Sequence, residues 1–168
     1  VYLMMNKIGG VVSSNKDGEH RTVFDLLGDE YRTPFLEDHL HLIGRLDMDT
    51  EGLLLFTTDG ELTHRIISPK NHINKTYFVI LRDELDDTKR SEIEQKFADG
   101  IEVGPDDNDP GFKCEAAKVV WPNVEQIETY LTNSTYTENA GNLSPEKLKK
   151  RRALLTIFEG KYHQVKRM

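Results

Sequence analysis

The sequence has one cysteine and one tryptophan among its 168 residues, and it has no apolar run of the length that a membrane-spanning helix needs. A single thiol, Cys114, cannot form a disulfide within the chain, and there is no Cys-x-x-Cys pair to hold a metal. We therefore expect a cytoplasmic protein with no membrane partner. In this setting Cys114 is interpreted as a small residue packed in a strand.

The composition is typical of a globular protein, with 30% charged and 37% apolar residues, and the length suits one domain or two small lobes. A net charge of −7 argues weakly against a nucleic-acid partner. The charge is unevenly distributed, however. Eleven acidic residues face three basic ones between positions 83 and 109, whereas eight basic residues face two acidic ones between 146 and 168. The second region would favour a phosphate backbone, although both could be ordinary solvated faces.

Short apolar and β-branched runs predict strands at residues 2–5, 42–43, 53–57, 75–81 and 154–158. The continuous run 53–57 is typical of a strand buried on both faces. Helices are predicted at 22–27, 61–67 and 86–98, with another beginning near 161. A hairpin around Pro122-Asn123 is predicted to join 114–121 to 126–131, and a loop is predicted at 133–143. This order favours an α+β fold with a mixed, mostly antiparallel sheet and flanking helices.

One loop stands out because it presents a carboxylate beside an arginine, between glycines, ahead of an apolar strand: Gly44-Arg45-Leu46-Asp47-Met48-Asp49-Thr50-Glu51-Gly52. A calcium loop fails because its twelfth position is Thr58, where a bidentate glutamate is required. A magnesium-dependent phosphatase with an Asp-x-Asp nucleophile remains a rival, although Gly44 and Arg45 interrupt the apolar run before Asp47. A simple turn capped by Asp47 and Thr50 is the structural alternative. The histidines at 39, 41, 64 and 72 could suggest zinc, but they have no tight pair and no thiol partner.

Four segments in order resemble the motifs of the RsuA-type pseudouridine synthases. They are Asn6-Lys7-Ile8-Gly9-Gly10, with Ile8 in place of the usual proline, the Asp47 loop, Lys75-Thr76-Tyr77, and Glu159-Gly160-Lys161-Tyr162-His163-Gln164-Val165-Lys166-Arg167-Met168. The resemblance implies the pseudouridine synthase fold with an active-site cleft across residues 1–168. Members usually carry an N-terminal S4 RNA-binding module, which is not visible here, so we expect this chain to be a catalytic-domain fragment.

The resemblance also implies the site residues. Asp47 would be the catalytic carboxylate, acting as nucleophile or as base. Tyr77 would contact the uracil and take a proton, and Lys166 would pair with the aspartate. Arg45 would insert into the RNA stack as the uridine is extruded. Lys7, Lys75 and Arg167 are further expected RNA contacts.

The implied reaction converts one uridine to pseudouridine in ribosomal RNA, or in a pre-ribosomal particle, by a monomer. It involves no net redox change and no hydrolysis, so no metal and no organic cofactor is expected. The segment Tyr162–Lys166 resembles enzymes acting on 16S small-subunit RNA, with a large-subunit enzyme as an alternative. A non-catalytic RNA-binding or ribosome-assembly module is the rival from another class.

Overall fold

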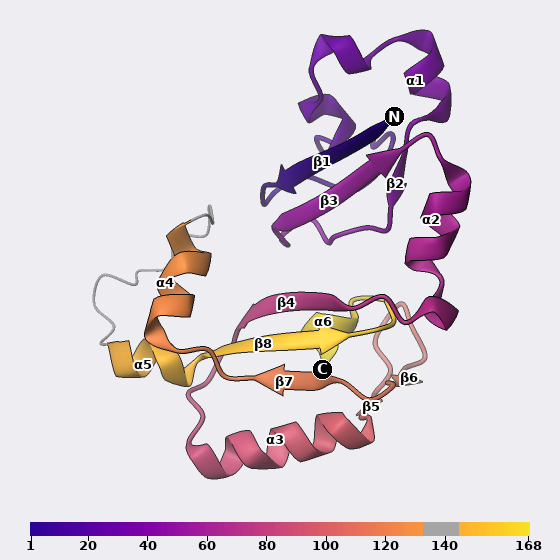
Figure 1. Cartoon of the computed structure of the whole chain (residues 1–168). Coiled ribbons are helices and arrows are strands. Elements are labelled where there is room, and N and C mark those ends of the chain that lie inside the picture. Colours follow the sequence, from indigo (N-terminus) through magenta and orange to yellow (C-terminus); the bar gives the residue numbers. More distant parts are fainter. Residues whose placement is uncertain (133–144) are drawn as a thin grey trace. The chain divides into compact units, whose positions relative to one another are not determined.

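Antiparallel strand pairing organises the protein, whose computed structural model describes residues 1–132 and 145–168 (Figure 1). The described chain divides into two units, residues 1–71 and residues 72–132 with 145–168. Each unit has its own sheet, and each is described by itself. The α+β class with mostly antiparallel sheets, predicted from the sequence, is confirmed.

The first unit contains a three-stranded antiparallel sheet in the order β1-β3-β2. Its strands are β1 (Tyr2–Lys7), β2 (His41–Ile43) and β3 (Gly52–Thr57). The central strand β3 is the apolar run that the sequence suggested would be buried on both faces, and this prediction is wrong. Leu54 and Phe56 are buried, but Leu53 is 67% exposed. The strand alternates because its core cluster packs against the face that carries Leu54 and Phe56.

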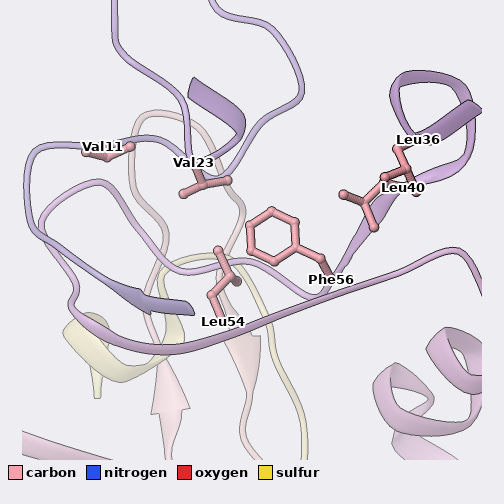
Figure 2. Close-up of a cluster of buried hydrophobic side chains, with 6 residues drawn as sticks. All are labelled: Val11, Val23, Leu36, Leu40, Leu54 and Phe56. Atoms are coloured by element: carbon pink, nitrogen blue, oxygen red, sulfur yellow. The ribbon is translucent and has the colours of Figure 1, made fainter. Parts of the chain in front are cut away.

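The core of this unit lies against that inner face of β3. Figure 2 shows Leu54 and Phe56 pointing to the same side, toward Val23. The ring of Phe56 meets the ring of Phe24 edge to face at a centroid distance of 5.3 Å. Burial of side chains of this size stabilises the fold by roughly 1.5–3 kcal/mol each. This cluster holds the strands between which the Asp47 loop runs.

Two helices complete the first unit. The helix α1 (Pro34–His39) begins at Thr33, whose hydroxyl oxygen accepts a hydrogen bond from the backbone N–H of Leu36. The Thr-Pro pair is a helix-start signal that the sequence analysis missed. The helix α2 (Gly60–Ile67) confirms the prediction for 61–67 and is capped by Asp59.

Three 3-10 turns connect these elements: Phe24–Leu26, Asp29–Tyr31 and Pro69–Asn71. The helix predicted at 22–27 is only the first of these turns. The N-cap residue of this turn is Val23. Thr22, which precedes it, and Asp25 form reciprocal hydrogen bonds, each from its backbone N–H to the side chain of the other. Because both residues satisfy each other's polar groups locally, the segment closes into one short turn.

The second unit contains a three-stranded antiparallel sheet in the order β4-β8-β7 and a two-stranded pair β5-β6. The strands are β4 (Lys75–Ile80), β5 (Glu102–Val103), β6 (Phe112–Lys113), β7 (Lys118–Val120) and β8 (Arg152–Ile157). The helices are α3 (Asp87–Asp99), α4 (Val124–Thr132), α5 (Pro145–Lys150) and α6 (Gln164–Arg167). Figure 1 shows α3 lying beside β7.

Helix α3 confirms the prediction for 86–98 within one residue. Asp86 caps its start by accepting the N–H of Lys89, and Gly100 ends it at a φ of +79°. A Cβ atom at position 100 would lie 2.5 Å from the carbonyl oxygen of Cys114, so both the backbone conformation and the space require glycine.

The hairpin predicted around Pro122-Asn123 is wrong, because the segment after Asn123 is the helix α4. The side chain of Asn123 accepts the N–H of Gln126, and the side chain of Gln126 accepts the N–H of Asn123. This reciprocal capping box outweighed the β-propensity of the following residues. Ile127 then fixes the helix by burying its side chain.

The loop predicted at 133–143 lies outside the described residues. Within residues 1–132 and 145–168, no helix is long and apolar enough to cross a membrane.

Candidate active site

The Asp47 loop connects β2 to β3 in the first unit. It leaves β2 through Gly44 at a φ of +79° and enters β3 through Gly52 at a φ of +114°, a conformation that favours glycine at both ends. Between them the N–H of Thr50 donates to the carbonyl of Asp47 at 3.0 Å and closes a tight turn. The turn leaves the side chain of Asp47 partly exposed. The local sequence therefore bends the chain so that one carboxylate can be reached by a ligand.

Lys7 anchors this loop to the end of β1. Its side chain is fully buried, and its Nζ atom donates to the carbonyl oxygens of Ile8, Met48 and Thr50 at 3.1, 3.1 and 2.8 Å. The burial of Lys7 and its three backbone acceptors argue against the expected contact with RNA. The lysine of the first motif instead ties β1 to the Asp47 loop.

Charge couples Lys7 to the acids of the loop as well. Burial lowers the pKa of Lys7 below its usual range, and the carboxylates of Asp49, Glu51 and Asp47 act against that shift. The buried ammonium of Lys7 therefore lies near the three carboxylates of the loop.

Two further contacts fix the loop on its other side. The hydroxyl of Ser13 donates to the carbonyl of Leu46 at 2.7 Å and accepts the N–H of the same residue at 3.1 Å. The N–H of Gly10 donates to the carbonyl of Met48 at 2.8 Å. The residues directly before and after Asp47 are thus each anchored to the segment that follows β1. This arrangement orients the carboxylate before any substrate arrives.

Arg45 lies two residues before Asp47 and is exposed. It borders an open groove of about 530 Å³, whose lining is Ser13, Ser14, Asn15, His41, Leu42, Gly44, Arg45 and Ile67. The lining combines the polar Ser13, Ser14 and Asn15 with the apolar Leu42 and Ile67. The groove is consistent with the expected RNA contact of Arg45.

Tyr77 lies on β4 of the second unit, opposite Leu155 of β8. It is partly buried and packs against the cluster of Ala117, Leu155 and Ile157. Val165 of α6 packs on the same cluster, so one small core positions both the Tyr77 strand and the helix that carries Lys166. Lys166 itself is exposed.

Glu159 organises the turn before α6. It is 5% exposed, and its carboxylate accepts hydrogen bonds from the N–H of Glu115 and from the side chain of Gln164, and forms an ion pair with Lys161 at 2.8 Å. Burial alone would raise the pKa of Glu159, but the hydrogen bonds from Lys161, Glu115 and Gln164 hold it below its usual range. The carboxylate therefore remains ionised and fixes the segment that leads to Lys166.

Arg167 also makes structural contacts, which argue against its expected role as an RNA contact. Its side chain is 11% exposed. The guanidinium donates to the carbonyl of Gly104 at 2.6 Å, bonds Asp109 at 3.1 Å, and lies over the ring of Phe112 at 4.9 Å. These contacts tie α6 to the connection between β5 and β6.

Lys75 at the start of β4 is partly buried, and its Nζ atom makes long contacts of 3.5 and 3.4 Å to the carbonyls of Ile73 and Phe158. These long hydrogen bonds do not test whether Lys75 contacts RNA, so that contact stays a prediction. The sequence analysis did not single out Ser13, Glu159 or Gln164 as site residues. Glu159 and Gln164 are five residues apart, and nothing in the sequence marks them as a pair. Only the folded structure shows that their side chains are hydrogen-bonded.

Among the described residues, no three side chains of His, Cys, Asp or Glu gather as they would to bind a metal ion. In this part of the chain His41 bonds Thr63 at 2.8 Å, and His39 stacks on Phe35. His39 and His41 therefore have local partners of other kinds.

The architecture places the protein with the pseudouridine-forming enzymes. A crystal structure of pseudouridylate synthase matches the fold with a TM-score of 0.67 and 32% sequence identity, over 99% of this chain and 54% of that one. The RNA pseudouridylate synthase family matches residues 1–168. The chain belongs to this family.

Individual relatives refine the likeness. The chain is 38% identical over 170 residues to an uncharacterized RNA pseudouridine synthase, YtzG, of Bacillus subtilis, covering all of this chain and 56% of that protein. It is 38% identical to ribosomal small subunit pseudouridine synthase A of Vibrio vulnificus, over 99% of this chain and 56% of that protein. It is 36% identical to the protein of the same name from Escherichia coli, over 99% of this chain and 55% of that protein. The chain thus spans about half the length of the curated relatives it matches.

Proposed function

We propose that the protein isomerises uridine to pseudouridine in RNA, with Asp47 as the catalytic carboxylate. The observation that carries the proposal is the anchoring of the Asp47 loop. Lys7 bonds its residues 48 and 50 from one side, and Ser13 bonds Leu46 from the other. These anchors hold a partly exposed acid in one position, as a catalytic carboxylate requires. Family membership supports the same conclusion.

The reaction explains why one such carboxylate is needed. The bond between ribose C1′ and uracil N1 breaks, the uracil turns, and C1′ bonds to C5, after which C5 loses its proton. A carboxylate can act at the sugar as nucleophile or take a proton as base, and either role requires its ionised form.

The remaining roles follow the residue chemistry. We assign Tyr77 to contact with the uracil and to proton transfer from C5, because its ring is only partly buried on β4. Lys166, exposed on α6, would supply a cation for the catalytic carboxylate. Arg45 would enter the RNA stack, since a planar guanidinium stacks on bases and binds phosphates. Lys75 would contact the RNA backbone.

We further propose that the RNA is ribosomal and belongs to the small subunit, as free RNA or as part of a pre-ribosomal particle. The names of the relatives from Vibrio vulnificus and Escherichia coli support the small subunit, whereas the Bacillus subtilis relative carries no such assignment. Large-subunit RNA is the alternative substrate that the experiment must include.

The test is to incubate the full-length protein with unmodified small-subunit and large-subunit RNA, naked and in particles, and to map pseudouridine. We expect product at a uridine of small-subunit RNA and none with Asp47→Asn. Asp49→Asn is the matched control, because Asp49 lies on the same loop and is exposed. It should retain activity within about threefold, a difference below 1 kcal/mol in the barrier.

Different failures have different meanings. Absence of product from every RNA would refute the synthase activity and favour a non-catalytic RNA-binding module. Product from large-subunit RNA alone would refute only the substrate. Full activity of Asp47→Asn would refute the catalytic residue. Absence of product together with magnesium-dependent hydrolysis of a phosphate ester would support the phosphatase-like alternative.

A further inference from the structure

Tyr162 and His163 form a stacked aromatic pair on the surface of the second unit. Their ring centroids are 4.0 Å apart with an interplanar angle of 24°. Tyr162 is 41% exposed, and His163 is exposed. Neither belongs to the hydrophobic cluster that Val165 and Met168 join. The two rings therefore contribute little to the core of this unit.

The backbone on both sides of the pair is firmly held. Before it, Lys161 bonds the carbonyl of Lys113 and pairs with the buried carboxylate of Glu159. After it, the buried side chain of Gln164 donates to Glu159 at 2.7 Å, and Arg167 is anchored at Gly104. Because the flanks are fixed, the rings are presented in one orientation, which lowers the entropy lost when a partner binds.

The charge around the pair selects the partner. Lys161 and Lys166 are exposed within four residues of it. The acids near this segment are ion-paired, Glu159 with Lys161, and Asp106 and Asp109 with Arg167. A flat aromatic surface on a segment that also carries the exposed Lys166 suits a nucleobase of an anionic chain, since bases stack on Tyr and His rings.

We infer that Tyr162 and His163 are a base-stacking platform that binds an unpaired nucleotide of the RNA substrate. The inference rests on the proposed function, because it assigns a further contact to the same RNA. Both rings are exposed, and each stacks on the other. The platform contributes affinity and selects single-stranded flanks of the target, and it takes no part in bond breaking.

The experiment measures binding of the full chain to a single-stranded RNA oligonucleotide containing 2-aminopurine, whose fluorescence falls when the base stacks on an aromatic ring. Tyr162→Leu keeps the apolar bulk but removes the ring. We expect it to bind about tenfold more weakly and to lose the fluorescence quenching. Tyr162→Phe keeps the ring and should bind within about twofold of the wild type.

The salt dependence separates stacking from charge. Stacking releases no counterions, so Tyr162→Leu should keep the wild-type slope of log K against log salt. Arg45→Met removes an exposed cation outside the platform and should reduce that slope by about one, as expected for one lost phosphate contact. His163→Asn removes the second ring but keeps a residue that tolerates the φ of 47° found there, and it should also weaken binding.

Tyr130 provides a matched control. It is 44% exposed, lies on α4 of the same unit, and stacks on Phe78 with a centroid distance of 5.0 Å. Tyr130→Leu should leave RNA binding and quenching unchanged. Wild-type affinity of Tyr162→Leu, a parallel loss in Tyr130→Leu, or no binding by the wild type at low salt would each overturn the inference.

The two proposals fail in different ways. If ribosomal RNA acquires pseudouridine and Tyr162→Leu binds normally, the platform is refuted and the proposed activity remains. If no pseudouridine forms but Tyr162→Leu loses binding and quenching, the activity is refuted and the platform remains.

Discussion

The Nζ atom of Lys7 lies 2.8 Å from the carbonyl oxygen of Thr50, a residue 43 positions further along the chain. This bond joins the end of β1 to the loop that carries Asp47. It explains why a lysine of the first motif and an aspartate of the second belong to one arrangement. Lys7 anchors the loop through hydrogen bonds to its backbone carbonyls, and its side chain is buried.

Lys7→Met tests this relationship. The change keeps the length of the side chain but leaves the carbonyls of Ile8 and Thr50 without their buried donor, and the free energy of unfolding should fall by on the order of 3 kcal/mol. Thermal unfolding measures this loss. Lys16→Met is the control, because Lys16 is exposed in the same unit and should unfold within about 0.5 kcal/mol of the wild type. Equal effects of the two changes would contradict the role of Lys7.

Ser13→Ala tests the second anchor of the loop. Its hydroxyl both donates to and accepts from the backbone of Leu46, so its removal loosens the residue before Asp47. We expect kcat to fall about tenfold with KM nearly unchanged, because displacement of a catalytic group slows the reaction more than it weakens binding.

Ser14→Ala is the control for this prediction. Ser14 borders the same groove, but its hydroxyl bonds only the nearby carbonyl of Lys16. Ser13→Thr retains a hydroxyl and should recover most of the rate. A rise in KM without a change in kcat would show that Ser13 binds RNA instead of orienting Asp47.

Glu159→Gln tests the buried carboxylate under α6. The folded pKa of Glu159 lies below its usual range, so its ionised form stabilises the fold above the pKa of an unfolded glutamate, and this contribution is lost as pH falls through the folded pKa. At neutral pH the variant should be less stable by about 2 kcal/mol. The difference from the wild type should shrink at acid pH.

Unfolding midpoints recorded across acid and neutral pH provide the measurement. Glu115→Gln is the control, since its exposed side chain changes while its backbone N–H still donates to Glu159. A stability difference that stays constant with pH would mean that the charge of Glu159 has no part in the effect.

Two arginines should separate stability from RNA binding. Arg167→Met removes donors to Gly104 and Asp109, and the free energy of unfolding should fall by about 2 kcal/mol. Arg45→Met should leave stability unchanged, because Arg45 is exposed, but should weaken RNA binding and lower its salt slope. A variant of Arg167 that unfolds normally and loses RNA binding would restore it as an RNA contact.

Local signals predicted much of the fold. The turn residues and caps around α2 and α3 act within a few positions, so their helices could be predicted to within one residue. The segment after Asn123 was assigned to a strand because its β-propensity was weighed without the capping bonds to Gln126. The exposure of Leu53 also could not be predicted, since an apolar run does not show which face the core will cover.

The sequence by itself determined the family, the position of the candidate carboxylate and the residue types around it, because these depend on short motifs and on glycines whose conformations are local. Only the tertiary structure decided which cations remain available to RNA. Lys7 and Arg167 look like RNA contacts in the sequence, but carbonyls from distant segments surround their donors. A side chain whose donors are satisfied inside the fold has little left to offer a phosphate, and long-range packing alone determines that outcome.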